Sequence, residues 1–354
     1  MTRRTLAIVI AVPLMVGLWL CAAFVPVPYV TYHPGVTVDI LSEAGGQERV
    51  QVTGHKTYHD SGELRMTTVS VTSPEYDVSL FSAVESWLSD EAAVQPYSSV
   101  YEEGETNEAS DKQSHAYMVT SQETAVAAAL TEMGYDLKPT AEVAAVGKDE
   151  PASGVLKVKD RIVKVGSTAV STPDQVIQAA GEATPGEPLK LVVVRDYDRT
   201  SLTVTPKDED GKPKLGINVG VGLDLPFKVS LDINPDIGGP SAGLMFSLAV
   251  YDTLTPGSLT GGHQIAGTGT IDVKGTVGTI GGIQQKIPGA RDAGAELFLV
   301  PNASPDSSNC DEAVGAANGD MDVVPVKGLH DAINVIKKWV DDPNADLPSC
   351  QDQE

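Results

Sequence analysis

The segment DIGGPSAGLMFSLAVYD, residues 236–252, places a serine between a Gly-Gly-Pro turn and an apolar run. Leu244, Leu248 and Ala249 recur at the spacing of one helix face, so the sequence predicts a buried helix that begins near Ser241. The serine then has two interpretations. It caps the helix with its hydroxyl, or it is a nucleophile at the electropositive helix end, where backbone N–H groups stabilise an oxyanion. A nucleophile needs a base, so the rest of the chain has to decide.

The chain has 354 residues, which is enough for two or three domains that each bury a core. Its formal net charge of -23 at pH 7 leaves no basic surface of the kind that nucleic-acid binding requires. Apolar periodicities recur among many glycines and prolines. This pattern indicates a multidomain protein of α/β and α+β type that does not bind nucleic acid.

The N-terminus begins with two arginines, Arg3 and Arg4, followed by an uncharged stretch from Leu6 to Phe24. As a helix this stretch is roughly 28 Å long, close to the thickness of a bilayer core. The positive-inside rule puts the N-terminus in the cytoplasm and the rest of the chain outside. A cleaved signal peptide with small residues at 21–23 is the alternative. We expect residues 1–28 to be a single-pass anchor in the cell membrane, with extracellular domains.

Residues 29–116 alternate between polar and apolar side chains, for example over 48–58 and 62–73, which predicts a β-rich region of short antiparallel strands. A helix-like stretch follows at 80–94. The charged segment 101–115 is predicted to be a loop. We assign this region a structural or spacing role.

Residues 117–210 begin with a predicted linker helix, in which Thr120 and Glu123 have the spacing of a capping box. The strand DRIVKV, the helix TPDQVIQAAG and the strands LKLVVVRD and TSLTVTP follow. Their order over about 141–206 resembles a PDZ domain of the kind attached to bacterial proteases. The resemblance implies capture of extended peptides beside a strand edge, with a spacer module as the alternative. We find no GLGF-like loop upstream, so recognition of C-termini or of internal segments stays open.

Residues 211–354 contain the opening segment and two further motifs, AGTGTI and IGGIQQK. GGPSAG and these two motifs, in this order, resemble the proteolytic domain of the Lon protease family over about 229–340. The resemblance implies a proteolytic α/β domain with Ser241 as nucleophile and Lys286 as general base. It also implies supporting roles for Thr268, for Gly239 and for Pro240. With the anchor and the PDZ-like module, the chain is similar to exported bacterial PDZ-containing Lon-type serine proteases.

A lysine base has to lose its proton near neutral pH. From a reference pKa of about 10.4 this costs roughly 4.6 kcal/mol at pH 7, and burial lowers a lysine pKa by up to roughly 3–5 units. We therefore expect Lys286 to be buried, with its amine within hydrogen-bond reach of Ser241 and Thr268. Pro288 predicts a late start or a kink in the helix that follows. Asp236, the acid nearest the serine, is interpreted as a turn residue.

The sequence contains no GxxxxGK[ST], CxxC or HExxH motif, so neither an ATP-driven module nor a metal or cofactor site is expected. Two cysteines, Cys310 and Cys350, lie in the region expected to be exported. A disulfide between them is one interpretation, and two free thiols are the other.

These features lead to one main hypothesis, a membrane-anchored, ATP-independent serine endopeptidase with a Ser241/Lys286 dyad. Its substrates would be unfolded or exposed segments of membrane or secreted proteins, captured with help from the PDZ-like module. Lon-type domains often form rings, so a homo-oligomer is expected only by analogy with that family. The alternative is a catalytically inactive, peptide-binding PDZ scaffold. A trypsin-like protease is disfavoured because no GNSGG-type motif occurs.

Overall fold

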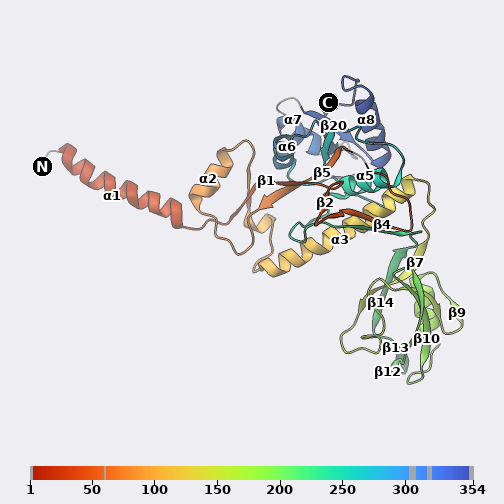
Figure 1. The fold of residues 1–354 in the computed structure, drawn as a ribbon. Helices are drawn as coiled ribbons and strands as arrows, with labels where there is room; N and C mark the ends of the chain where they lie inside the picture. Colours follow the sequence, from red (N-terminus) through yellow and green to blue (C-terminus); the bar gives the residue numbers. More distant parts are fainter. Residues whose placement is uncertain (1–2, 60, 303–307, 317–320, 351–354) are drawn as a thin grey trace. The chain divides into compact units, whose positions relative to one another are not determined.

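The computed structural model describes residues 3–59, 61–302, 308–316 and 321–350 (Figure 1). The chain forms a mixed α/β protein with two compact units. The large unit comprises residues 1–51, 56–133 and 230–354, and the small unit comprises 52–55 and 134–229.

The large unit is organised around a mixed sheet with strand order β20-β19-β16-β5-β1-β6. Its strands are β1 (Tyr29–Asp39), β5 (Glu63–Val71), β6 (Ala93–Pro96), β16 (Gln264–Gly267), β19 (Leu297–Pro301) and β20 (Asp322–Val326). Strands β5, β16, β19 and β20 pair in parallel, whereas β1 is antiparallel to β5 and to β6. Strands that are about 200 residues apart in sequence are thus neighbours, with Glu63 opposite Gln264 and Met66 opposite Gly267.

This pairing gives a division of the chain that differs from the expected domain boundaries. Residues 29–116 are not a separate antiparallel region, because β5 completes the sheet to which the C-terminal strands belong. Conversely, β14 (Ile217–Leu223), which lies in the segment 211–354 predicted to be the proteolytic domain, pairs with β7 (Pro139–Val146) inside the small unit. Local periodicity could not reveal either partner.

The helices of the large unit are α1 (Arg3–Phe24), α2 (Leu80–Leu88), α3 (Asn107–Glu132), α5 (Gly243–Leu254), α6 (Ile283–Asp292), α7 (Ser308–Ala316) and α8 (Leu329–Asp341). Helix α5 is buried on nearly all sides, and not only on the face of Leu244, Leu248 and Ala249 that the sequence predicted to be buried. Helix α3 packs along it. The predicted buried helix after Ser241 is therefore present at the centre of the unit.

Helix α3 begins about 13 residues before the predicted helix start. Its N-cap is Thr106, whose Oγ1 accepts a hydrogen bond from the backbone N–H of Ala109 at 3.3 Å. Thr120 lies inside the helix and donates to the carbonyl of Ala116 at 3.0 Å, so it does not act as a cap. The predicted loop over 101–115 was thus wrong from Asn107 onward, because a cap at Thr106 stabilises a helix with a mainly polar first half.

The small unit contains a second sheet with strand order β11-β10-β8-β7-β14, and β9 pairs with β8. Its further elements are β8 (Arg161–Val165), β9 (Thr168–Ala169), α4 (Pro173–Gly181), β10 (Leu189–Arg195) and β11 (Asp198–Val204). Buried Asp160 accepts two hydrogen bonds at 2.6 Å from Arg195. This charged pair fixes the start of β8 to the end of β10.

Short elements complete the chain: β2 (Glu43–Ala44), β3 (Gln47–Glu48), β4 (Val50–Thr53), a 3-10 turn (Tyr97–Ser99), β12 (Lys207–Glu209), β13 (Lys212–Lys214), β15 (Lys228–Leu231), β17 (Thr270–Ile271) and β18 (Val277–Gly278). Cys310 on α7 and Cys350 in the C-terminal segment form a disulfide. The bond ties the end of the described chain to the large unit.

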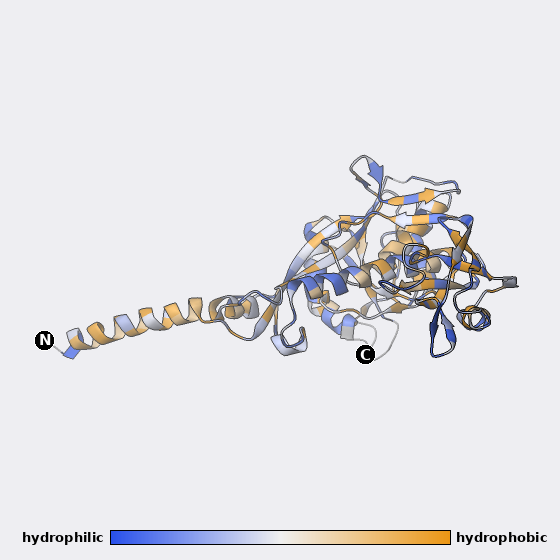
Figure 2. Ribbon diagram, turned by 90° about the horizontal axis from the view of Figure 1, so that it is seen from below, coloured by the Kyte–Doolittle hydropathy of each residue, from blue (hydrophilic) through white to orange (hydrophobic). Residues whose placement is uncertain are grey.

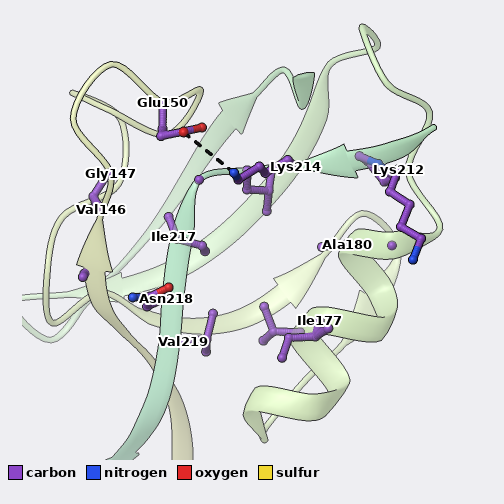
Figure 3. Close-up of a pocket in the computed structure, with 16 residues that line it drawn as sticks. Val146, Gly147, Glu150, Ile177, Ala180, Lys212, Lys214, Ile217, Asn218 and Val219 are labelled. Atoms are coloured by element: carbon purple, nitrogen blue, oxygen red, sulfur yellow. Dashed lines mark ion pairs between the residues drawn. The ribbon is translucent and has the colours of Figure 1, made fainter. Parts of the chain in front are cut away.

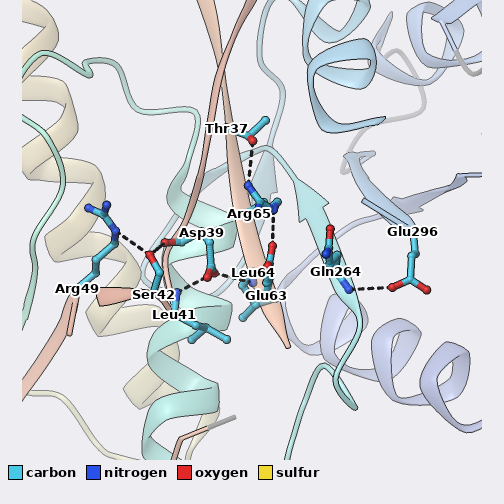
Figure 4. Close-up of polar contacts among 10 residues, drawn as sticks. All are labelled: Thr37, Asp39, Leu41, Ser42, Arg49, Glu63, Leu64, Arg65, Gln264 and Glu296. Carbon is cyan, nitrogen blue, oxygen red and sulfur yellow. Dashed lines mark hydrogen bonds and ion pairs between the residues drawn. The ribbon is translucent and has the colours of Figure 1, made fainter. Parts of the chain in front are cut away.

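Partly buried polar contacts set the register at the start of β5 (Figure 4). The Asp39 carboxylate accepts backbone hydrogen bonds from Leu41 at 3.0 Å and Leu64 at 3.2 Å, and burial raises its pKa. Arg65 donates to Glu63 at 2.5 Å and to Thr37 at 3.2 Å. Because these groups join β1 to β5, they also fix the strand that leads to the site described below.

Helix α1 has 22 residues and no buried side chain, and its most apolar stretch of 18 residues has a mean hydropathy of 2.5 (Figure 2). Among the described residues it is the one helix long and apolar enough to cross a membrane. A membrane anchor and a signal sequence share these properties.

Candidate active site

Ser241 lies two residues before α5, at the end of the Gly-Gly-Pro turn. Its Oγ is 2.7 Å from Nζ of Lys286. Ala242 occupies the N-cap position and makes no side-chain cap bond. The serine hydroxyl therefore faces a lysine, and the capping interpretation of Ser241 does not describe the structure.

Helix α3 holds the turn that presents Ser241. The Gly239 N–H donates to the carbonyl of Ser114 at 2.9 Å, and Ser121 Oγ donates to the carbonyl of Pro240 at 3.0 Å. A Cβ on Gly238 would lie 2.5 Å from the Ser114 side chain. Gly238 thus permits the close approach of α3, and the N–H of Gly239 is bonded to that helix.

Lys286 sits in the first turn of α6 and is 2% exposed. The helix begins after Gly282, whose φ of 78° is in the left-handed region, and the Gly282 carbonyl accepts from the backbone N–H of Lys286 at 3.0 Å. Pro288 lies inside α6, which starts five residues before it and continues to Asp292. The expected late start was wrong, because the turn at Gly282 initiates the helix.

Thr268, fully buried after β16, connects the two residues. Its Oγ1 accepts from Lys286 Nζ at 2.8 Å and donates to the carbonyl of Ser241 at 2.9 Å. The Gly269 N–H donates to the same carbonyl at 2.7 Å. Since the threonine proton is used by Ser241, its oxygen acts as an acceptor toward the amine, which orients the amine at the serine hydroxyl.

Burial lowers the pKa of Lys286 from 10.5 to about 7. Desolvation is the cause, because a low-dielectric environment disfavours the ammonium form. A substantial fraction of the amine is therefore neutral near pH 7, with a lone pair that can accept a proton.

The dyad opens into a cavity of about 490 Å³. Its lining comes from β1, β5, α3, the turn before Ser241 and the turn before α6: Tyr32, Gly35, Val36, Met66, Thr67, Thr68, Val69, Ser70, Val71, Met118, Asp236, Ile237, Gly238, Ser241, Ala242, Gly281 and Lys286. Asp236 is exposed at the rim, and its N–H donates to Asn234, as in a turn. None of these lining residues is a histidine.

Within the part of the chain that the structure describes, no strand pairs with one edge of β5 where it borders the cavity. Strand β16 pairs with β5 up to Met66, whereas β1 pairs with β5 as far as Val71 on the other edge. In the described structure, residues 67–71 therefore present backbone groups to the cavity that holds Ser241 and Lys286. An extended polypeptide is the kind of ligand that such an edge accommodates.

Two residues that hold the segments around the site, Ser121 and Asn309, were not predicted from the sequence. Ser121 falls on the apolar stripe of α3 between Met118 and Ala125, a pattern that could have identified a buried polar contact. Asn309 on α7 is 1% exposed, and its amide donates to the carbonyl of Ile280 at 2.7 Å and accepts from the Ile280 N–H at 3.0 Å. It fixes the chain just before Gly281, and no local pattern marks it.

The small unit has a separate groove of about 690 Å³ between α4 and β14 (Figure 3). Strand β14 is an edge strand, because it pairs only with β7 in the sheet. Ile177 of α4 and Val219 of β14 lie in the groove. Leu215 and Gly216 line the groove and directly precede β14, so the loop that leads into this edge follows the segment 141–206 in the sequence.

Comparison with known proteins agrees with both resemblances. Residues 234–338 match the family model of the Lon protease (S16) C-terminal proteolytic domain, and residues 126–205 match the PDZ domain model. The chain thus combines a segment similar to Lon proteolytic domains with a PDZ domain, in a mixed α/β fold.

The individual proteins that match the chain include Lon proteases and a PDZ domain. The chain is 30% identical over 146 residues to the Lon protease of Campylobacter concisus, covering 41% of this chain and 18% of that protein. It is 22% identical over 214 residues to the Lon protease of Syntrophus aciditrophicus, covering 54% of this chain and 27% of that protein. Each match thus spans less than a third of the relative. The PDZ domain of an SdrC-like protein from Listeria innocua matches 23% of this chain and 92% of its own, at 21% identity and a TM-score of 0.21.

Proposed function

We propose that the protein is a serine endopeptidase in which Ser241 is the nucleophile and Lys286 the general base. The observation that carries this proposal is the 2.7 Å contact between Ser241 Oγ and a buried amine whose pKa is lowered to about 7. The similarity of residues 234–338 to Lon proteolytic domains supports the same reaction.

The chemistry follows from the arrangement of three polar groups. Neutral Lys286 takes the proton of the Ser241 hydroxyl as Oγ attacks the carbonyl carbon of the scissile peptide bond. The ammonium then gives this proton to the leaving amine, which yields an acyl-enzyme. A water molecule, deprotonated by the same lysine, hydrolyses the ester and regenerates the hydroxyl. Thr268 holds the amine in line throughout.

The substrate is proposed to bind as an extended chain beside residues 67–71 of β5. A folded domain cannot offer such a segment, so the enzyme would act on unfolded or locally exposed stretches. The groove between α4 and the edge strand β14 offers a second place for an extended peptide, which is the binding mode of PDZ domains. We therefore propose that the small unit increases the local concentration of substrate near the dyad.

We further propose that α1 anchors the protein in the cell membrane, with the N-terminus in the cytoplasm and both units outside. Arg3 and Arg4 precede the apolar stretch, as the positive-inside rule requires of the cytoplasmic end. The disulfide Cys310–Cys350 fits an oxidising, extracellular location. The chain lacks a phosphate-binding GxxxxGK[ST] motif, so hydrolysis is proposed to need no ATP.

Hydrolysis of an unfolded protein tests the proposal. The purified full chain should degrade unfolded casein at the same rate with and without ATP. Ser241→Ala and Lys286→Met should each lower the rate by at least about 10³-fold, as losses of a nucleophile or its base do. An unchanged rate in Ser241→Ala would exclude the dyad. If the wild type binds peptides but cleaves none, the inactive PDZ scaffold becomes the better description.

A further inference from the structure

Helix α2 presents an apolar face to solvent. In this nine-residue helix the large apolar side chains are 43–73% exposed: Leu80, Phe81, Val84, Trp87 and Leu88. The buried positions hold the small residues Ala83 and Ser86. A surface helix of a soluble protein normally has the opposite arrangement, with large apolar residues facing the core.

The exposed residues form one continuous surface. At about 100° per residue, the five side chains fall within an arc of roughly 120°. Glu85 lies at the edge of this arc, and Asp90 follows the helix. The charged residues that border the apolar face are therefore acidic. A negatively charged partner, which would need basic groups on the protein, does not fit this face.

The chain tethers α2 to the end of α1. Helix α1 ends at Phe24, and three residues later the N–H of Val27 donates to the carbonyl of Val78 at 2.8 Å. Pro26 forms a β-bridge with Ser79, the N-cap of α2. A nine-residue helix is about 14 Å long, so no part of α2 is far from the point where α1 ends.

We propose that the exposed face of α2 inserts into the interfacial layer of the membrane that α1 spans, with lipid as its partner. The inference rests on the proposed anchoring by α1. Tryptophan, phenylalanine and leucine are typical of the apolar face of a helix that lies at the boundary between headgroups and acyl chains, and Trp87 and Phe81 are two of the exposed side chains. Since the flanking charges are acidic, insertion depends on apolar contact and needs no anionic lipid. Helix α2 would hold the large unit against the membrane surface, where membrane proteins expose loops near the bilayer.

The three tryptophans provide the test. Trp19 lies in α1, Trp339 is buried, and Trp87 is 73% exposed. The full chain with Trp19→Phe is reconstituted in vesicles of phosphatidylcholine, with or without bromine at carbons 6 and 7 of one acyl chain. Bromine quenches only nearby indoles. We expect Trp87 fluorescence to fall by at least twofold in brominated vesicles, and the matched Trp19→Phe/Trp87→Phe variant to show little quenching.

Two outcomes would overturn the inference. Protein that resists carbonate extraction from the vesicles but shows no quenching of Trp87 is anchored without insertion of α2. The same conclusion follows if Trp87 escapes quenching and cross-links to a second copy of the chain, because the exposed face of α2 then contacts protein and not lipid. Failure of anchoring itself is a different result, because carbonate would then release the protein from the vesicles. Phe81→Ser/Leu88→Ser, at exposed positions, should reduce the quenching while casein hydrolysis in detergent is unchanged.

Discussion

At the scale of single residues, the buried amine of Lys286 links activity to pH. Only the neutral amine can accept the serine proton, and its pKa is lowered to about 7. The proposed function therefore predicts that kcat/KM for a peptide rises about tenfold per pH unit below pH 7 and levels off above it. Initial rates between pH 5 and 9 would measure this. If kcat/KM instead reached its plateau only near pH 10, the amine of Lys286 would be hydrated in solution and its pKa would not be lowered.

The same amine should affect stability in a defined direction. The pKa of Lys286 falls from 10.5 in the unfolded chain to about 7 in the folded one. Between these pH values the unfolded chain binds more protons, so the free energy of unfolding rises with pH, by up to about 1.4 kcal/mol per unit. The cost of the buried amine is constant below about pH 7 and vanishes above about pH 10.5.

Denaturant unfolding of the wild type and Lys286→Met across pH 6–10 isolates this contribution. The difference in unfolding free energy between the two proteins should change in favour of the wild type as pH rises through this window. Parallel pH dependences would contradict the assignment.

Thr268 can be tested with a nearly isosteric substitution. Thr268→Val removes the acceptor that orients Lys286 and the donor to the Ser241 carbonyl. We expect kcat to fall about 10- to 100-fold, equivalent to roughly 1.4–2.7 kcal/mol, with little change in KM. Thr268→Ser, which keeps the hydroxyl, is the control and should stay within about threefold of the wild type. Equal activity of all three proteins would remove Thr268 from the mechanism.

At the scale of elements, α3 packs closely against the turn before α5 because Gly238 in that turn has no side chain. Gly238→Ala would place a Cβ 2.5 Å from the Ser114 side chain. We expect a loss of about 1–3 kcal/mol in the free energy of unfolding and a lower kcat, because the turn also positions Ser241. The measurement is urea unfolding together with peptide hydrolysis.

Gly315→Ala is the matched control for this substitution. Gly315 lies in α7 with open space where a Cβ would be and without a left-handed φ, so alanine should be neutral or stabilise by up to about 1 kcal/mol. If Gly238→Ala is as stable and active as Gly315→Ala, the close approach of α3 does not constrain the site.

At the scale of the whole molecule, the two units are proposed to divide the work between capture and cleavage. Ile177 lines the groove of the small unit and is 63% exposed, so Ile177→Ser should not disturb a core. We expect a several-fold higher KM for unfolded casein and no change for a peptide too short to reach both sites. Val158→Ser is the control, because Val158 is similarly exposed in the same unit but does not line the groove. Equal KM values for both variants would argue against capture by the small unit.

The sequence by itself determined the buried helix after Ser241, the order of strands and helix in the PDZ-like module, and an apolar N-terminal helix. These features depend on side-chain periodicity and turn residues within about 20 positions, which local physical chemistry controls. Two of the three Lon-like motifs, GGPSAG and IGGIQQK, also indicated which serine and lysine to compare, although residues 241 and 286 are 45 positions apart.

Only the tertiary structure decided how the two units are composed and what surrounds the dyad. β5 joins β16 across about 200 residues, and β14 joins the small sheet. The contacts of Ser121 with Pro240 and of Asn309 with Ile280 join segments that are far apart in the sequence. Pairing between distant strands leaves no periodic trace, and a lysine's pKa depends on how completely neighbouring elements exclude water.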